Sequence, residues 1–187
     1  NALGWDVHKS SVPISQGTAL GKNVFWSDTY SDLRTEYYVS YAPNENVVPT
    51  VAYGNKILSK ATLSGMAQTL ESQGKRVVSG LNGDWYVVAT GATTGLVVTN
   101  GAVRATPYYT TSWAIGFQTD GSAFIAQTGL TTQVTFGGKS YPLTGAINKV
   151  RQVNKNGVGG LTLLTSDFAS TTQNTQAGVD VVLPPVD

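Results

Sequence analysis

The chain has 187 residues, of which 41% are hydrophobic and only 12% are charged, so it is long enough and apolar enough to bury a core. Intrinsic disorder accompanies high charge and low hydrophobicity, so this composition argues against a disordered chain. The formal net charge is +1 and no Lys/Arg cluster occurs, which disfavours nucleic acid and anionic membranes as partners. The absence of Cys excludes disulfides and metal–thiolate sites. No run of 18 apolar residues occurs, so no membrane span is predicted.

Short strands are expected in the polar, turn-rich first third of the chain. Residues 4–7, 23–26 and 36–41 are rich in apolar and aromatic residues, and Pro43 ends the last of these segments. Large aromatic rings usually belong to the core, and those expected there are Trp5, Trp26 and Trp113.

A single helix is predicted over residues 60–73. Ser59 or Thr62 is the expected N-cap, and Gly74 can end the helix in a left-handed conformation. Apolar residues recur at helical spacing, which predicts one buried stripe. This stripe consists of Leu63, Met66, Ala67 and Leu70.

After Gly74 the pattern is almost wholly that of β-structure. Three hairpin turns are predicted between β-branched or aromatic runs, at Asn100-Gly101, Asp120-Gly121 and Gly137-Gly138. The later predicted strands cover residues 146–153, 161–165 and 179–183. We therefore expect residues 1–187 to form one α+β unit, a mainly antiparallel sheet with one main amphipathic helix packed on it.

The segment 79–101 carries the most specific pattern of the chain. An apolar strand at 77–81 is predicted to run into Asn82-Gly83-Asp84, which two aromatic residues and a Thr/Gly loop follow. A second strand, 96–99, precedes the Asn100-Gly101 turn. By itself Asn-Gly-Asp is more often a turn than a site. Polar side chains at the end of a buried strand are nevertheless held rigidly, and glycines let a ligand approach the backbone.

This order of pieces resembles the phosphodiester glycosidase family, the relatives of N-acetylglucosamine-1-phosphodiester α-N-acetylglucosaminidase. The resemblance covers nearly the whole chain, although no single motif is unique to the family. Besides segment 79–101, the segments that carry it are residues 37–44, 51–54, 113–117, 120–121, 147–151 and 161–165.

The resemblance implies a hydrolase that cleaves the bond between a sugar C1 and a phosphate oxygen in an extracellular glycan or wall polymer. Phosphate is a good leaving group, so a carboxylate near C1 and a cation near the phosphate form the minimum set. The resemblance places Asn82, Asp84 and Arg151 in catalytic roles. Substrate binding is expected from Thr94, Gly95, Trp85 and Asn148.

Two of these assignments have a competing interpretation from the residues themselves. Arg151 is equally well a solvated strand residue, and Asn148 faces the opposite side of a regular strand from Arg151. Thr94 and its neighbour Thr93 also fit a loop without a binding role.

The family's acidic, glycine-rich loop from its second half has no counterpart here. The Gly-Gly pairs, Gly137-Gly138 and Gly159-Gly160, lack the preceding acid. We therefore expect the chain to match the amino-terminal half of such a domain, incomplete on its C-terminal side. The missing half would come from another chain or segment, or two copies would pair edge to edge. Alone, these 187 residues are expected to hydrolyse a sugar 1-phosphodiester poorly or not at all.

The alternative function is a non-catalytic carbohydrate-binding or structural module of a cell-surface protein. Ser-His-Asp catalysis is excluded unless His8, the only histidine, is recruited. No cofactor is expected, and a calcium site at Asp28, Asp32 and Glu36 is conceivable without support from their pattern. The Cys-free, low-charge composition suits a secreted or cell-surface protein.

Overall fold

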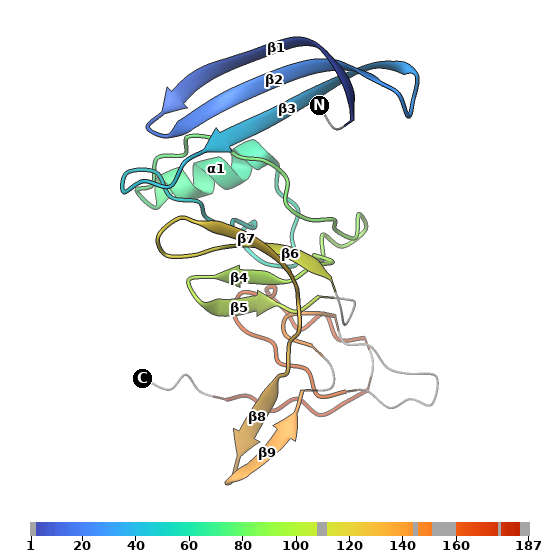
Figure 1. Cartoon of the computed structure of the whole chain (residues 1–187). Coiled ribbons are helices and arrows are strands. Elements are labelled where there is room, and N and C mark those ends of the chain that lie inside the picture. The colour runs from blue at the N-terminus through green and yellow to red at the C-terminus, as the bar shows by residue number, and fades with distance from the viewer. Residues whose placement is uncertain (1–2, 108–111, 144–145, 151–159, 176, 184–187) are drawn as a thin grey trace.

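The computed structural model describes residues 3–107, 112–143, 146–150, 160–175 and 177–183 (Figure 1). These residues form antiparallel strands and a single short helix, so the fold is mainly β with a minor α component. A three-stranded sheet lies at one end, and three two-stranded hairpins follow beyond the helix. The elements are β1 (Gly4–Ser15), β2 (Thr18–Ser27), β3 (Asp32–Tyr41), α1 (Leu63–Ser72), β4 (Val97–Thr99), β5 (Ala102–Ala105), β6 (Trp113–Phe117), β7 (Ala123–Gln127), β8 (Gln133–Phe136) and β9 (Lys139–Pro142).

The three strands predicted in the first third exist and are longer than expected. They form one antiparallel sheet in the order β1-β2-β3. Its turns contain Gly17 with φ 62° and Ser31 with φ 52°, conformations that tight turns require. Gly21 lies under the ring of Tyr38, where a Cβ atom would come within 2.1 Å of a ring carbon. Glycine therefore lets the ring lie flat on the sheet.

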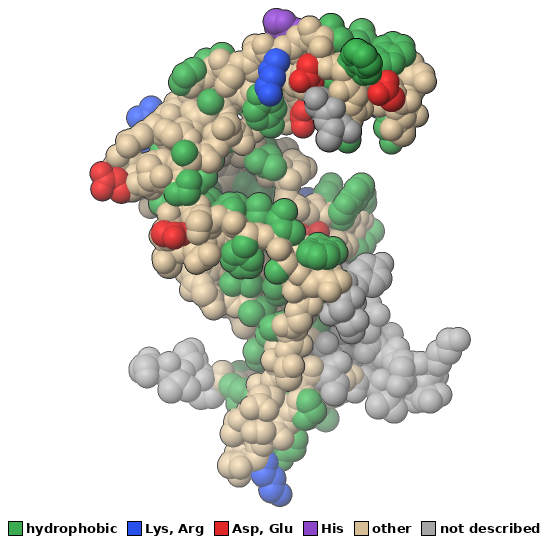
Figure 2. Space-filling model, in the orientation of Figure 1, with side chains coloured by type: hydrophobic (Ala, Val, Ile, Leu, Met, Phe, Trp, Pro, Cys, Tyr) green, Lys and Arg blue, Asp and Glu red, His purple; other side chains and the backbone are tan. Residues whose placement is uncertain are grey.

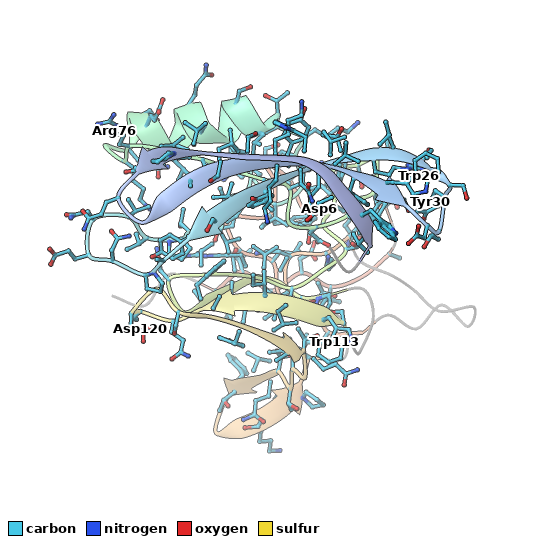
Figure 3. The ribbon with its side chains drawn as sticks, turned by 45° about the horizontal axis from the view of Figure 1, so that its top comes forward. Asp6, Trp26, Tyr30, Arg76, Trp113 and Asp120 are labelled. Atoms are coloured by element: carbon cyan, nitrogen blue, oxygen red, sulfur yellow. The ribbon has the colours of Figure 1, made fainter. Side chains whose placement is uncertain are left out.

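The tryptophans predicted in the core are on the surface instead. Trp5 and Trp26 are cross-strand partners and expose 73% and 42% of their surface, while Trp113 exposes 68%. Figure 3 shows Trp26 beside Tyr30 at one end of the sheet and Trp113 on the separate β6–β7 hairpin. The core prediction is wrong because no second layer of the described residues covers these rings. Figure 2 shows further hydrophobic side chains on the surface.

The helix is confirmed but shorter than predicted. It begins at Leu63, and the Thr62 hydroxyl caps it by accepting a hydrogen bond from the Gly65 amide at 3.1 Å. The expected burial of its stripe is wrong, because Leu63 is 45% exposed and Met66 and Leu70 are only half-buried. Among the described residues, no helix is long and apolar enough to cross a membrane.

The three predicted hairpins are confirmed, whereas the strands predicted before and after them are not. Asn100 and Gly101 take φ 51° and 75° between β4 and β5, as a tight hairpin turn requires. Residues 77–81, 161–165 and 179–183 form no strand, and residues 146–150 contribute only an isolated parallel bridge, Ile147 to Leu163. Residues 151–153 of the predicted strand lie outside the described residues. Pairing partners, rather than local propensity, decide these segments.

The described core is small and lies next to the candidate site. Ile57, Val97 and Ala105 form a buried cluster, and Tyr53 packs against it. Phe168 is 2% exposed, and its carbonyl accepts the Leu58 amide at 2.9 Å. The loop before α1, the β4–β5 hairpin and the segment around Phe168 are thereby held together.

Candidate functional site

The predicted site segment folds back on itself as a short antiparallel loop. The amides of Val87 and Thr94 donate to the carbonyls of Ala92 and Trp85, at 2.8 and 3.0 Å. Gly91 closes the tip with φ 79°, and a Cβ atom there would lie 2.5 Å from the Ser59 carbonyl oxygen. The loop sequence therefore brings Asp84, at its open end, opposite residues 94–95.

The carboxylate of Asp84 is fixed by hydrogen bonds to this loop. Its Oδ2 accepts the Gly95 amide at 2.7 Å, and its Oδ1 accepts the Trp85 amide at 2.7 Å. The Thr94 hydroxyl lies 3.2 Å from Oδ1 and 2.9 Å from the Trp85 carbonyl. A Cβ atom on Gly95 would lie 2.9 Å from Oδ2, so only glycine fits without displacing the carboxylate. Each carboxylate oxygen can accept two bonds, which leaves Oδ2 capacity for a ligand hydroxyl.

Lys149 is a buried cation whose charge interacts with that of Asp84. It is 5% exposed, and its Nζ donates to the carbonyl of Thr93, two residues before Gly95. Burial lowers the pKa of Lys149 from 10.5 to about 8, and the negative charge of Asp84 acts in the opposite direction. The site thus combines an exposed carboxylate with a buried amine that is largely protonated at neutral pH.

Asn148, next to Lys149 in the chain, stabilises the site through buried hydrogen bonds. It is 1% exposed and takes φ 52°, a conformation that Asn tolerates better than most residues. Its Nδ2 donates to the Arg104 carbonyl at 2.7 Å and to the Thr165 hydroxyl at 2.8 Å, and its Oδ1 accepts the Thr165 amide at 2.8 Å. Asn148 therefore joins three segments and fixes the backbone that carries Lys149.

An ion pair involves Arg104, whose carbonyl binds Asn148. Arg104 Nη1 donates to Asp167 Oδ2 at 2.7 Å, with both side chains 29% exposed, and Arg104 Nε donates to the Thr99 hydroxyl at 2.8 Å. Burial, with a smaller contribution from Asp167, raises the pKa of Tyr53. These contacts connect β4 and β5 to the segment before Phe168. They stabilise the part of the chain on which the candidate site is built.

The structure brings together some of the predicted site residues and leaves others apart. Asp84, Thr94 and Gly95 form one hydrogen-bonded cluster, whereas Asn82 and Trp85 are exposed on the same loop, Trp85 by 85%. Asn148 is 1% exposed and its side chain is bonded within the protein, so its role in substrate binding stays a prediction. Arg151 lies outside the described residues.

Lys149 and Arg104 were not singled out from the sequence as site residues, and Asp167 was interpreted mainly as a surface residue. The available signal for Lys149 was a lone cation in the otherwise uncharged run 143–150. Among the described residues, no three His, Asp or Glu side chains group to hold a metal ion, and Asp32 instead binds Arg34 at 2.7 Å. The suggested calcium site at Asp28, Asp32 and Glu36 stays an untested suggestion.

The buried amine makes stability depend on pH in a defined direction. Below pH 8 Lys149 is protonated in the folded and unfolded states, so its contribution is constant. Between pH 8 and 10.5 the unfolded chain binds more protons, so the free energy of unfolding rises by about 3 kcal/mol. Urea unfolding of wild type and Lys149→Met at pH 7 and pH 10.5 checks this. The wild-type value minus the variant value should increase, and a constant difference contradicts the burial of the charge.

Comparisons of the chain with family models, with curated proteins and with solved structures find no match. The chemistry of the site itself therefore carries the functional proposal.

Proposed function

We propose that the Asp84 loop is the site of a hydrolase that cleaves the C1–O bond of a sugar 1-phosphodiester in an extracellular glycan or wall polymer. The observation that carries the proposal is the orientation of the Asp84 carboxylate by the Gly95 and Trp85 amides, together with the buried positive charge of Lys149. A carboxylate and a cation are the two groups that this reaction needs. The resemblance to phosphodiester glycosidases supports the same choice.

In the proposed reaction the C1–O bond breaks and its electron pair leaves with the phosphate oxygen. Asp84 stabilises the positive charge that develops at C1, and a water molecule adds to C1 and gives its proton to Asp84. Lys149 is buried, so its charge favours the phosphate leaving group through space rather than by contact. Because the pKa of Lys149 is about 8, this assistance is expected to fade above that pH.

A carbohydrate-binding module is the second candidate, and the exposure of Trp85 favours it. An aromatic ring that is 85% exposed beside a fixed carboxylate offers a stacking surface and a hydrogen-bond acceptor for a sugar. The two functions share a carbohydrate ligand and an extracellular location. They differ in whether bound substrate is turned over.

The proposal is tested by assaying the full-length gene product and the 187-residue chain side by side. The substrates are a sugar 1-(methyl phosphate) diester and the matching methyl glycoside. We expect the full-length protein to hydrolyse the diester and not the methyl glycoside, and the 187-residue chain to bind the diester with little turnover. Binding without turnover in both proteins would favour the carbohydrate-binding module, and absence of binding would contradict both functions.

A further inference from the structure

The third strand of the first sheet has an open edge. β3 is hydrogen-bonded to β2 along ten residue pairs, and within the described residues no strand pairs with its other side. Residues 32–37 are all exposed. Long unpaired edges are usually shortened, charged throughout or covered, since they invite pairing with another strand.

The charges on this edge are arranged symmetrically about one residue. Arg34 and Glu36 lie on the same face of the sheet, with Thr35 between them on the other face. Arg34 Nε binds Asp32 Oδ1 at 2.7 Å, and its guanidinium lies 4.4 Å from the centre of the Tyr30 ring. The two Nη groups carry four more N–H donors, so Arg34 keeps the capacity to bind a second carboxylate.

We propose that two copies of this chain pair antiparallel through β3, with the two-fold axis at Thr35. In this register Arg34 faces Glu36 of the partner subunit and Glu36 faces Arg34 of the partner subunit. On the other face, Leu33 meets Tyr37 of the partner subunit, also twice. The two three-stranded sheets become one six-stranded sheet, and this pairing is independent of the proposed hydrolase activity.

The neighbouring registers are disfavoured by charge. Side chains on the same face of the sheet must lie opposite each other, so odd-numbered residues pair with odd-numbered ones and even-numbered with even-numbered. The two-fold axis can therefore pass through Thr35 or through a neighbouring residue, but not between two residues. If the axis passes through Arg34, the two copies of Arg34 lie opposite each other. If it passes through Glu36, the two copies of Glu36 lie opposite each other. Like charges directly opposite destabilise a strand pair, and opposite charges stabilise it.

The first sheet also leaves large apolar side chains next to this edge exposed. Leu33 is 59% exposed and Tyr37 is 69% exposed. A hollow of about 390 Å³ borders the edge between Phe25, Tyr30 and residues 34–37, and the partner strand would cover it.

Cysteine cross-linking tests the position of the axis, and the chain is suited to it because it has no native cysteine. Opposite residues of an antiparallel pair lie about 4.5–5.5 Å apart, which a disulfide can span. Thr35→Cys should therefore give a covalent dimer under mild oxidation. The matched variant Leu33→Cys, on the same strand and face, should stay uncrosslinked because its two copies lie about 13 Å apart along the strands. Cross-linking of Leu33→Cys alone, or of neither, overturns the register.

Charge exchange tests the pairing without a new bond. Sedimentation should show a dimer for wild type, and Arg34→Glu or Glu36→Arg should weaken it at least tenfold in Kd. The double variant Arg34→Glu/Glu36→Arg should restore it, because opposite charges face each other again. The control Glu71→Lys, on the exposed side of α1, should dimerise as wild type. A monomeric wild type, or a dimer that none of these changes affects, overturns the proposal.

Discussion

Asp84→Asn is expected to lower kcat/KM for a sugar 1-phosphodiester by at least about 100-fold in the full-length protein. The amide still fills the place of the carboxylate but supplies no negative charge at C1 and no base for the attacking water. In the native protein the Gly95 amide donates to Oδ2 of Asp84 at 2.7 Å. In the variant either the oxygen or the NH₂ group of the asparagine side chain takes this position. The change therefore acts on the chemistry more than on the volume of the site.

The matched control for this change is Asp120→Asn. Asp120 is an exposed turn residue whose Oδ1 accepts the Ser122 amide at 2.9 Å and the Ser122 hydroxyl at 2.6 Å. These bonds lower the pKa of Asp120, much as site carboxylates are often perturbed, yet Figure 3 places it in the β6–β7 turn. Its activity should stay within about twofold of wild type. Equal losses for Asp84→Asn and Asp120→Asn would make Asp84 a loop-forming residue only.

The coupling between Asp84 and Lys149 is tested by the pH profile of the same variant. Removing the Asp84 charge takes away the interaction that raises the pKa of Lys149, so this pKa should fall below about 8. The residual activity of Asp84→Asn should then decline at lower pH than that of wild type. A decline at the same pH in both proteins would show that the Lys149 charge does not assist the reaction.

Asn148→Ala is expected to lower the free energy of unfolding by about 4 kcal/mol, the largest stability effect of a single substitution at the site. The change removes three hydrogen bonds that join residues 104, 148 and 165, each worth about 1 kcal/mol, in a fully buried position. The left-handed backbone at Asn148 adds a further cost of about 1 kcal/mol for alanine.

Asn100→Ala isolates the backbone part of this effect. Asn100 takes almost the same φ, 51° against 52°, but it is exposed in the β4–β5 turn. Urea unfolding should show a loss of about 1 kcal/mol for Asn100→Ala. If the two variants lose the same amount, the hydrogen bonds of Asn148 do not support the site in solution.

Local signals predicted the parts of the fold that short-range chemistry decides. The Asn100-Gly101 turn needs positive φ at two residues, and the Thr62 cap needs only a hydroxyl before a helix, so both could be predicted from the residues alone. Trp5 and Trp26 were placed in the core wrongly, since burial depends on whether a second layer covers the sheet. The strand predicted at 77–81 is wrong for a similar reason, because in the described part of the chain no strand pairs with it.

The candidate site was predictable only where its contacts are close in sequence. Asp84, Thr94 and Gly95 belong to one loop, and their Asn-Gly-Asp and Thr-Gly patterns pointed to them. Lys149 reaches Thr93 across 56 positions of the chain, and such a contact has no local signature. The supporting role of Asn148 depends in the same way on Arg104 and Thr165, which the β5 hairpin and the core bring together.

The most direct measurement of the central claim is the position of the oxygen that enters during hydrolysis. The full-length protein is incubated with a sugar 1-(methyl phosphate) diester in water enriched in oxygen-18, and the methyl phosphate is examined by phosphorus NMR. Cleavage of C1–O places the heavy oxygen on the sugar, so we predict a methyl phosphate signal without an isotope shift. An isotope-shifted signal would show attack at phosphorus, and no methyl phosphate at all would show that the link between the sugar and the phosphate is not cleaved. Either result would contradict the assignment of Asp84 and Lys149 to a phosphodiester glycosidase site.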